Sequence, residues 1–249
     1  MRAINLVAGA LMLLLLTACQ ANHTAAVIQP TLTGDDSITP AMQEGDWWMD
    51  RHKEKLALKE EMKQVDLVFL GDSITHWWDV TGKNDWQAFY GDRRALNIGF
   101  SGDKTENVLW RLQHGAVDNI DPKLLVMMLG TNNAGHRREA PELTARGIKA
   151  VLNELEVRLP NTKILMLAIF PRGETDADIY RQLTMATNDI IKGYADNDRV
   201  YWLNINEHFL DGNRVLKKSV MKDLLHPNPD QYKVWGEAIE AEVSKLMEG

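Results

Sequence analysis

Short, mainly apolar runs recur along the chain and are separated by longer stretches that mix apolar and polar residues. A continuous run of about four to eight apolar residues, closed by a turn signal, is typical of a strand that is buried on both faces. The sequence therefore predicts five buried strands, at residues 67–70, 95–98, 124–129, 163–170 and 200–203.

Between these runs, apolar residues return at the spacing that places them on one face of a helix. The pattern is clearest where Ile148, Val151 and Leu155 share a face. Strands that alternate with helices predict a parallel sheet with helices on both faces, so we expect one α/β domain. The predicted helices begin near residue 46 and occupy residues 105–113, 141–159, 175–195 and 230–247.

The composition is that of a packed globular domain. The chain has 249 residues, of which 45% are hydrophobic and 25% are charged, so a folded domain is expected rather than disorder. The net charge of −7 argues against a nucleic-acid partner, which requires a basic surface. The single cysteine excludes an intrachain disulfide and a multi-cysteine metal site.

The position of that cysteine suggests a lipid anchor. A positive start at Arg2 and an apolar stretch over 4–16 are typical of a secretory signal peptide. Residues 16–19, Leu-Thr-Ala-Cys, resemble the lipobox of bacterial lipoproteins, which predicts a signal peptide at 1–18 and a lipidated Cys19. Gln20 in the next position favours the outer membrane of the cell envelope. The alternative is an ordinary cleavable signal with an incidental cysteine.

A polar segment separates the predicted anchor from the domain. Residues 19–42 lack hydrophobic periodicity and are interpreted as a lipidated N-terminus and flexible tether, and the domain is assigned to 43–249. Trp47, Trp48 and His52 then recur at near-helical spacing, which predicts a helix that packs on the domain. These tryptophans could instead line a sugar-binding rim.

Candidate chemistry lies just after the predicted strands. Ser73 follows the first strand through Gly71, which lets the backbone turn sharply. Gly102, Asn132 and Arg172 follow the next three strands. Because parallel strands end at one edge of the sheet, where open α/β folds bind ligands, we expect these residues to converge. Taken alone, Ser73 could equally be an ordinary helix cap.

A base for such a serine is offered by the segment Asp223-Leu224-Leu225-His226. On one loop, the carboxylate of Asp223 can fold back onto one imidazole nitrogen of His226 and leave the other nitrogen for Ser73. Pro227 and Pro229 stiffen the loop. Considered without reference to Ser73, the same two residues could be a surface aspartate and a histidine at a helix start.

Four motifs together resemble one family, the SGNH (GDSL-type) hydrolases, over about residues 65–232. The motifs are GDSI at 71–74, SGD at 101–103, GTNN at 130–133 and DLLH at 223–226. The segments 97–112 and 169–173 are similar to the platelet-activating-factor acetylhydrolase-like branch. Asn133 departs from the Asp of many relatives, although this branch often has Asn there.

The resemblance implies a three-layer α/β/α sandwich, flavodoxin-like, with strand order 2-1-3-4-5. It implies Ser73 as nucleophile, His226 as general base and Asp223 as the acid that orients the imidazole. The backbone N–H groups of Ser73 and Gly102 and the side-chain amide of Asn132 would form the oxyanion hole. No metal or cofactor is implied.

The function expected from the resemblance is hydrolysis of short-chain esters, chiefly acetyl esters. A cell-surface enzyme would meet acetylated carbohydrate, with a lysophospholipase or thioesterase as the alternative. A catalytically silent carbohydrate-binding module is a further alternative. The expected partners are a small ester or acetylated carbohydrate and the membrane, through the anchor; a homodimer is compatible with the branch.

Several other polar residues are expected to be structural. Asp72 is expected to support the turn before Ser73. Arg172 is expected to form a salt bridge, although it could instead contact the substrate. Asp103 and Arg111 are expected to hydrogen-bond within the Gly102 loop. Packing or surface roles are expected for most other histidines, namely His114, His136 and His208, whereas His76 could border the site.

Overall fold

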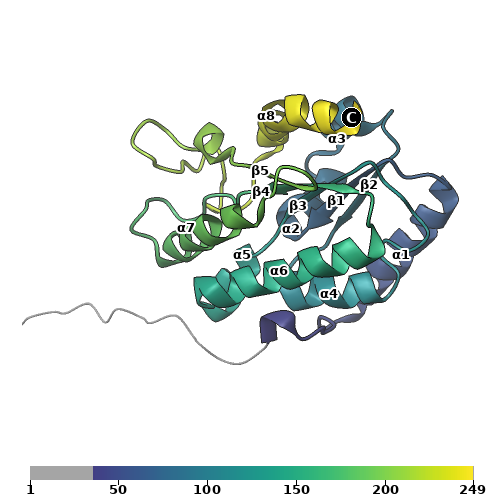
Figure 1. The fold of residues 1–249 in the computed structure, drawn as a ribbon. Coiled ribbons are helices and arrows are strands. Elements are labelled where there is room, and N and C mark those ends of the chain that lie inside the picture. The colour runs from purple at the N-terminus through teal and green to yellow at the C-terminus, as the bar shows by residue number, and fades with distance from the viewer. Residues whose placement is uncertain (1–35, 249) are drawn as a thin grey trace, which may run out of the picture.

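The five predicted strands form one parallel sheet. The computed structural model describes residues 36–248, and its sheet has the order β2-β1-β3-β4-β5 that the resemblance implies. All neighbouring strands pair in parallel (Figure 1). The strands are β1 (Leu67–Gly71), β2 (Ala95–Gly99), β3 (Leu124–Met128), β4 (Lys163–Leu167) and β5 (Val200–Leu203).

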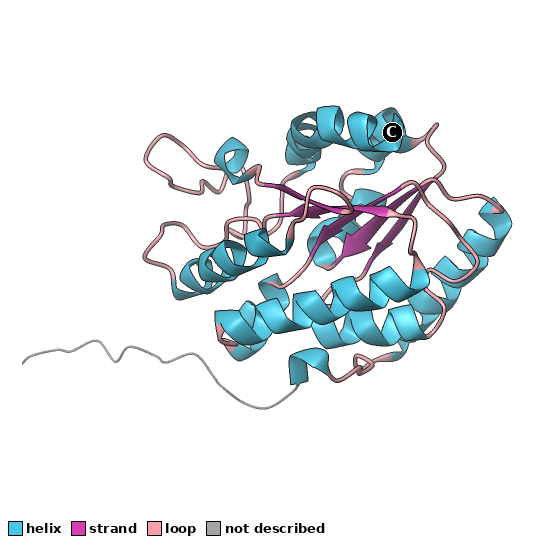
Figure 2. Cartoon of the chain, viewed as in Figure 1, coloured by secondary structure: helices cyan, strands magenta, loops and turns pink. Residues whose placement is uncertain are grey.

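Helices cover both faces of this sheet and complete the expected three layers. Helices α4, α6 and α7 lie on one face with α1 beside them, and α3 and α8 lie on the other (Figures 1 and 2). The helices are α1 (Asp46–Met62), α2 (Ser73–His76), α3 (Lys83–Tyr90), α4 (Thr105–Gln113), α5 (Thr131–Arg137), α6 (Pro141–Arg158), α7 (Ile179–Ile191) and α8 (Pro229–Glu248). Short 3-10 turns are η1 (Asp36–Ile38), η2 (Trp77–Asp79), η3 (Lys192–Tyr194) and η4 (Asn206–Phe209).

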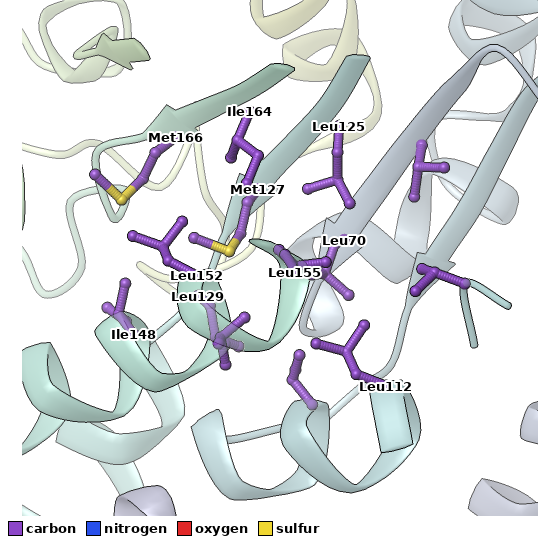
Figure 3. Packing of buried hydrophobic residues seen from close by; sticks show 14 of the residues in the cluster. Leu70, Leu112, Leu125, Met127, Leu129, Ile148, Leu152, Leu155, Ile164 and Met166 are labelled. Carbon is purple, nitrogen blue, oxygen red and sulfur yellow. The ribbon is translucent and has the colours of Figure 1, made fainter. Parts of the chain in front are cut away.

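The core consists of two hydrophobic clusters, one on each face of the sheet. In β1, Val68 and Leu70 belong to the cluster under α4 and α6, whereas Leu67 and Phe69 belong to the cluster under α3 and α8. Figure 3 shows Leu70 among side chains of the first cluster. Because successive strand residues point to opposite faces and both faces are covered, nearly every position is apolar. This double burial explains the continuous apolar runs.

Two predicted elements are longer than the observed ones. The helix predicted at 175–195 begins only at Ile179, because the side chain of Asp178 caps it by accepting hydrogen bonds from Tyr180 N (2.9 Å) and Arg181 N (3.2 Å). The strand predicted at 163–170 ends at Leu167, although residues 168–170 remain buried. The apolar residues at 168–170 therefore indicate burial and do not indicate that the strand continues.

Among the described residues, Ser37 already contacts the domain, although it lies within the segment that the sequence assigns to the tether. Ser37 is buried, its hydroxyl donates to Leu143 O (2.9 Å), and its carbonyl accepts from Thr105 Oγ1 (2.8 Å). Further along, Ala41 N donates to Glu106 O (3.1 Å). We call residues 36–45 the N-terminal strap, since they run across the starts of α4 and α6.

The predicted signal peptide at 1–18, Cys19 and most of the tether lie outside the described residues. Within residues 36–248, no helix is long and apolar enough to span a membrane.

Candidate active site

The ends of three neighbouring strands lie level with one another. Gly71 at the end of β1 is in register with Gly99 of β2 and with Met128 of β3. The chain leaves β1 for β2 on one side and later returns to β3 on the other, so a crevice for ligands is expected at this edge. The segments that carry Ser73, Gly102 and Asn132 begin at these strand ends, as predicted.

Ser73 is the first residue of α2, and the turn before it is tightly built. Asp72 caps the helix by accepting from Ile74 N (3.0 Å), which confirms its expected supporting role. A Cβ on Gly71 would lie 2.2 Å from Thr75 Oγ1 and 2.6 Å from Met128 O, so only glycine fits. Ser73 itself is only 6% exposed.

The loop before α8 brings Asp223, His226 and Ser73 into one hydrogen-bonded chain. His226 Nε2 lies 2.9 Å from Ser73 Oγ, and His226 Nδ1 lies 2.6 Å from Asp223 Oδ2. Because a carboxylate can only accept, Nδ1 donates to Asp223, and in the neutral imidazole Nε2 is left to accept from the Ser73 hydroxyl. The order of donors is therefore that of a serine, its base and an orienting acid.

The fold of this loop depends on Asp223. Its Oδ1 accepts from Leu225 N (3.1 Å) and His226 N (2.8 Å), while Leu224 has a left-handed φ of 59°. Partial burial acts to raise the pKa of the Asp223 carboxyl, but hydrogen bonds from the side chain and backbone of His226 outweigh it, and the pKa lies below its ordinary value. Asp223 is therefore ionised at neutral pH.

An aromatic residue, Trp77, completes the environment of His226. The ring of Trp77, in η2, stacks on the imidazole with centroids 4.3 Å apart and planes 18° apart. A cavity of about 510 Å³ opens beside this stack and beside Asp223, and it is mainly apolar. Its other lining residues are Thr81, Lys222, Pro227, Asn228 and Pro229. Trp77 thus fixes the ring plane of His226 and borders a space next to it.

Asn132 and the Gly102 loop are joined directly. Asn132, the second residue of α5, is 5% exposed, and its side-chain amide donates to Asp103 O (3.0 Å). Gly102 has a φ of 78°, which favours glycine. In the described part of the chain, neither the Ser73 N–H nor the Gly102 N–H has a recorded hydrogen-bond acceptor. Both N–H groups can therefore donate a hydrogen bond to a ligand that binds there.

His76 borders this loop, as the sequence suggested. Its Nδ1 lies 3.2 Å from Ser101 N and 3.0 Å from Ser101 Oγ, so it must be unprotonated to accept the backbone N–H. Burial, with the nearby Arg51 guanidinium, lowers the pKa of His76 to about 4, which keeps the ring neutral. His114, by contrast, contacts His52 through its carbonyl and stacks on Trp110.

Asp103 and Arg111 form the structural pair that the sequence predicted. Both side chains are fully buried, and Arg111 Nε donates to Asp103 Oδ2 (2.8 Å). Among the described residues, the expected salt bridge of Arg172 is not found. Arg172 Nη1 instead donates to Thr131 O (2.8 Å) and Thr131 Oγ1 (3.1 Å), and its guanidinium lies over the Tyr180 ring. Backbone and ring contacts satisfy it in place of a carboxylate.

No cluster for a metal ion is found in the described residues. Between residues 36 and 248, no group of three or more His, Cys, Asp or Glu side chains could hold one.

Residues 69–234 match the GDSL-like Lipase/Acylhydrolase family. The chain belongs to this family. It is thus a carboxylic ester hydrolase, in agreement with the resemblance seen in the motifs. The alpha2 subunit of platelet-activating factor acetylhydrolase IB from Rattus norvegicus is 34% identical over 186 residues, covering 74% of this chain and 78% of that protein.

Solved structures agree on the fold. A GDSL-like lipase from Bacteroides thetaiotaomicron superposes with a TM-score of 0.64 at 22% identity, covering 79% of this chain and 97% of that one. An acetyl xylan esterase from Geobacillus stearothermophilus superposes with a TM-score of 0.58 at 17% identity, covering 73% and 96%. At such identities the likeness is one of architecture.

Proposed function

We propose that this protein is a serine esterase that hydrolyses short-chain esters, acetyl esters first, through Ser73, His226 and Asp223. The observation that carries the proposal is the hydrogen-bonded chain from Ser73 Oγ through His226 to Asp223, with distances of 2.9 and 2.6 Å. Its position at the carboxyl edge of the sheet matches the edge where α/β folds bind ligands.

In the proposed mechanism, Ser73 Oγ attacks the ester carbonyl while its proton moves to His226 Nε2. Asp223 stabilises the imidazolium that forms, because its carboxylate accepts from Nδ1–H. His226 then gives the proton to the leaving alcohol, and an acyl-enzyme remains on Ser73. Water, deprotonated by His226, repeats the attack and releases the acid.

The charge on the tetrahedral intermediate requires preplaced donors. The N–H groups of Ser73 and Gly102 and the amide of Asn132 are proposed for this task, because the two N–H groups lack recorded acceptors in the described chain and Asn132 is tied to the Gly102 loop. Losing one such donor typically costs about 10²–10³ in rate.

For the substrate we propose acetylated carbohydrate. The names of a curated relative, an acetylhydrolase, and of a structural neighbour, an acetyl xylan esterase, support an acetyl group. The cavity beside His226 has the tryptophan and prolines that suit the apolar face of a sugar ring, and His226 is the residue that protonates the leaving alcohol. The alternative substrates are a lysophospholipid or a thioester. If one of them is the substrate, it should be hydrolysed faster than the other members of a substrate panel.

We also propose that the protein is exported and anchored at the bacterial cell envelope, at the outer membrane, through lipid on Cys19. The support is the apolar stretch at 4–16 followed by Leu-Thr-Ala-Cys at 16–19.

Active-site labelling tests the catalytic proposal. A fluorophosphonate probe should label the protein at Ser73, and Ser73→Ala should abolish both labelling and hydrolysis of p-nitrophenyl acetate. Ser219→Ala, at an exposed serine, is the matched control and should retain both. Near-normal turnover of folded Ser73→Ala, or absence of labelling in the folded wild type, would contradict the proposal. Rates on acetylated polysaccharides and on p-nitrophenyl esters of rising chain length then define the substrate.

A further inference from the structure

Gly102 lies in a β-turn of a kind that can adopt two alternative conformations, type I and type II. Asp103 N donates to Phe100 O (3.1 Å), and Gly102, the third residue of this turn, has a φ of 78°. This is the φ of a type II turn. Types I and II differ chiefly in the orientation of the central peptide, which here joins Ser101 to Gly102.

The orientation of that peptide decides where the Gly102 N–H points. The peptide unit is planar and trans, so the carbonyl of Ser101 and the N–H of Gly102 point in opposite directions. A rotation of the peptide to the type I form would turn the N–H away from its present direction while the Phe100–Asp103 bond persists. Glycine offers little steric resistance to such a rotation.

One side chain of the N-terminal strap holds the carbonyl of this peptide. Gln43 Nε2 donates to Ser101 O (3.0 Å) and to Asp103 Oδ1 (2.6 Å). The carboxylate of Asp103 is itself held in place, because it also accepts from Trp48 Nε1 (2.7 Å) and from Arg111 Nε (2.8 Å). Gln43 Oε1 lies 3.0 Å from where a Cβ on Gly102 would be, so the amide covers the outer side of the turn.

His76 does not duplicate this contact. It accepts from the N–H of Ser101, which belongs to the preceding peptide, between Phe100 and Ser101. Among the described residues, Gln43 is the only side chain recorded as a donor to Ser101 O. Within the described residues, Gln43 is therefore the one side chain recorded to hold the peptide that carries the Gly102 N–H.

We infer that Gln43 is a positioning residue for the oxyanion hole: by binding Ser101 O, it keeps the Gly102 N–H directed toward the reacting carbonyl. The inference rests on the proposed role of Gly102. It also makes the N-terminal strap part of the catalytic apparatus, although the strap lies outside the segments that resemble the family.

The test compares two replacements of Gln43 in the full-length protein. Gln43→Met keeps the length of the side chain and removes the donor, so kcat should fall about 10-fold or more, with KM for p-nitrophenyl acetate changed less than about 3-fold. Gln43→Lys restores a donor of similar reach and should lie within about 3-fold of wild type. Gln113→Met, at an exposed glutamine of α4, is the control and should leave kcat unchanged.

A second readout separates positioning from packing. The rate of phosphonylation by the fluorophosphonate probe depends on the same donors, so it should fall in Gln43→Met in proportion to kcat, while the thermal midpoint stays within a few degrees. Unchanged kcat in folded Gln43→Met, or an activity of Gln43→Lys no better than that of Gln43→Met, would overturn the inference. If wild type itself is neither active nor labelled, the proposed function has failed instead.

Discussion

Asp223 is the most exposed member of the hydrogen-bonded chain, and its replacement should reveal how much the orienting acid contributes. Its side chain is 53% exposed, whereas that of His226 is 17% exposed. Water can therefore partly solvate the imidazolium when the carboxylate is lost. We expect Asp223→Ala to lower kcat/KM by about 10²–10⁴, at least about 10-fold less than Ser73→Ala or His226→Ala. Initial rates on p-nitrophenyl acetate give the comparison; equal losses in all three variants would contradict it.

His52 should make the protein less stable at mildly acidic pH. It is buried, and its Nε2–H donates to His114 O (3.0 Å). Burial lowers the pKa of His52 from 6.5 to about 4, so between these values the unfolded chain binds a proton that the folded chain does not. The free energy of unfolding must then fall as the pH drops from about 6.5 toward 4.

Urea unfolding at pH 7 and pH 5 checks this effect. The glutamine in His52→Gln does not titrate in this range, so the urea midpoint of the variant should fall less between pH 7 and pH 5 than that of wild type. Some loss should remain, because the pKa of His76 is lowered in the same way. If the urea midpoint falls equally in both proteins between pH 7 and pH 5, the buried ring of His52 does not govern the loss of stability in acid.

At the scale of elements, a close contact between helices α6 and α4 depends on Gly147 of α6. A Cβ there would lie 2.4 Å from Thr105 Oγ1 at the start of α4 and 2.8 Å from Ser37 O of the strap. Gly147→Ala should therefore lower the free energy of unfolding by about 1–3 kcal/mol, as overpacking does. Activity should fall with it if the displaced strap carries Gln43 along.

Gly193→Ala is the matched control for this substitution. No atom lies within 4 Å of a Cβ at Gly193, so the change should be neutral or stabilise by up to about 1 kcal/mol. Chemical denaturation of both variants and wild type measures the difference. A Gly147→Ala protein as stable as Gly193→Ala would show that α6 can move away from α4 without loss.

The elements differ in how far the sequence could predict them. The strands were predicted well, because burial on both faces favours an apolar residue at nearly every position. Helix α3 was missed, because its apolar residues, Trp86, Phe89 and Tyr90, span little more than one turn. The shorter helices α2 and α5 were missed too, since their sequences, SITH and TNNAGHR, carry no apolar stripe of helical period. Their beginnings are set by caps and strand ends instead, which depend on contacts outside the local sequence.

The residues of the candidate site also differ in how far the sequence could predict their positions. Ser73, Gly102, Asn132 and the Asp223–His226 pair follow strands or share a loop, so their convergence could be inferred from topology. Gln43 and Trp77 could not be placed in this way. Gln43 reaches Ser101 across 58 positions of sequence, from a strap without periodicity, and nothing in its neighbourhood predicts that contact. The stacking of Trp77 on His226 likewise depends on how the last loop packs.

At the scale of the whole molecule, the site joins distant parts of one chain. Ser73 and His226 are 153 residues apart, and the sheet and both helical layers must form before they meet. The strap adds the N-terminal side of the domain to the same assembly. Through Gln43, this strap contacts the Gly102 loop.

The proposed anchor yields the last prediction. Cys19 is the only cysteine of the chain, so fatty acid attached to a cysteine can be attached only there. Several acyl chains hold a protein stably on a membrane, whereas a single chain binds only marginally. In a Gram-negative host, wild type should incorporate labelled palmitate and sediment with the outer membrane. Cys19→Ser should do neither.

The esterase activity of Cys19→Ser, measured after detergent extraction, should equal that of wild type, because residue 19 precedes the part of the chain that forms the site. Thr17→Ser keeps the cysteine and should behave as wild type in both assays. A Cys19→Ser protein that is still found in the outer membrane would contradict the lipid anchor. A wild type that is cleaved and soluble, without label, would instead indicate an ordinary signal peptide followed by an incidental cysteine.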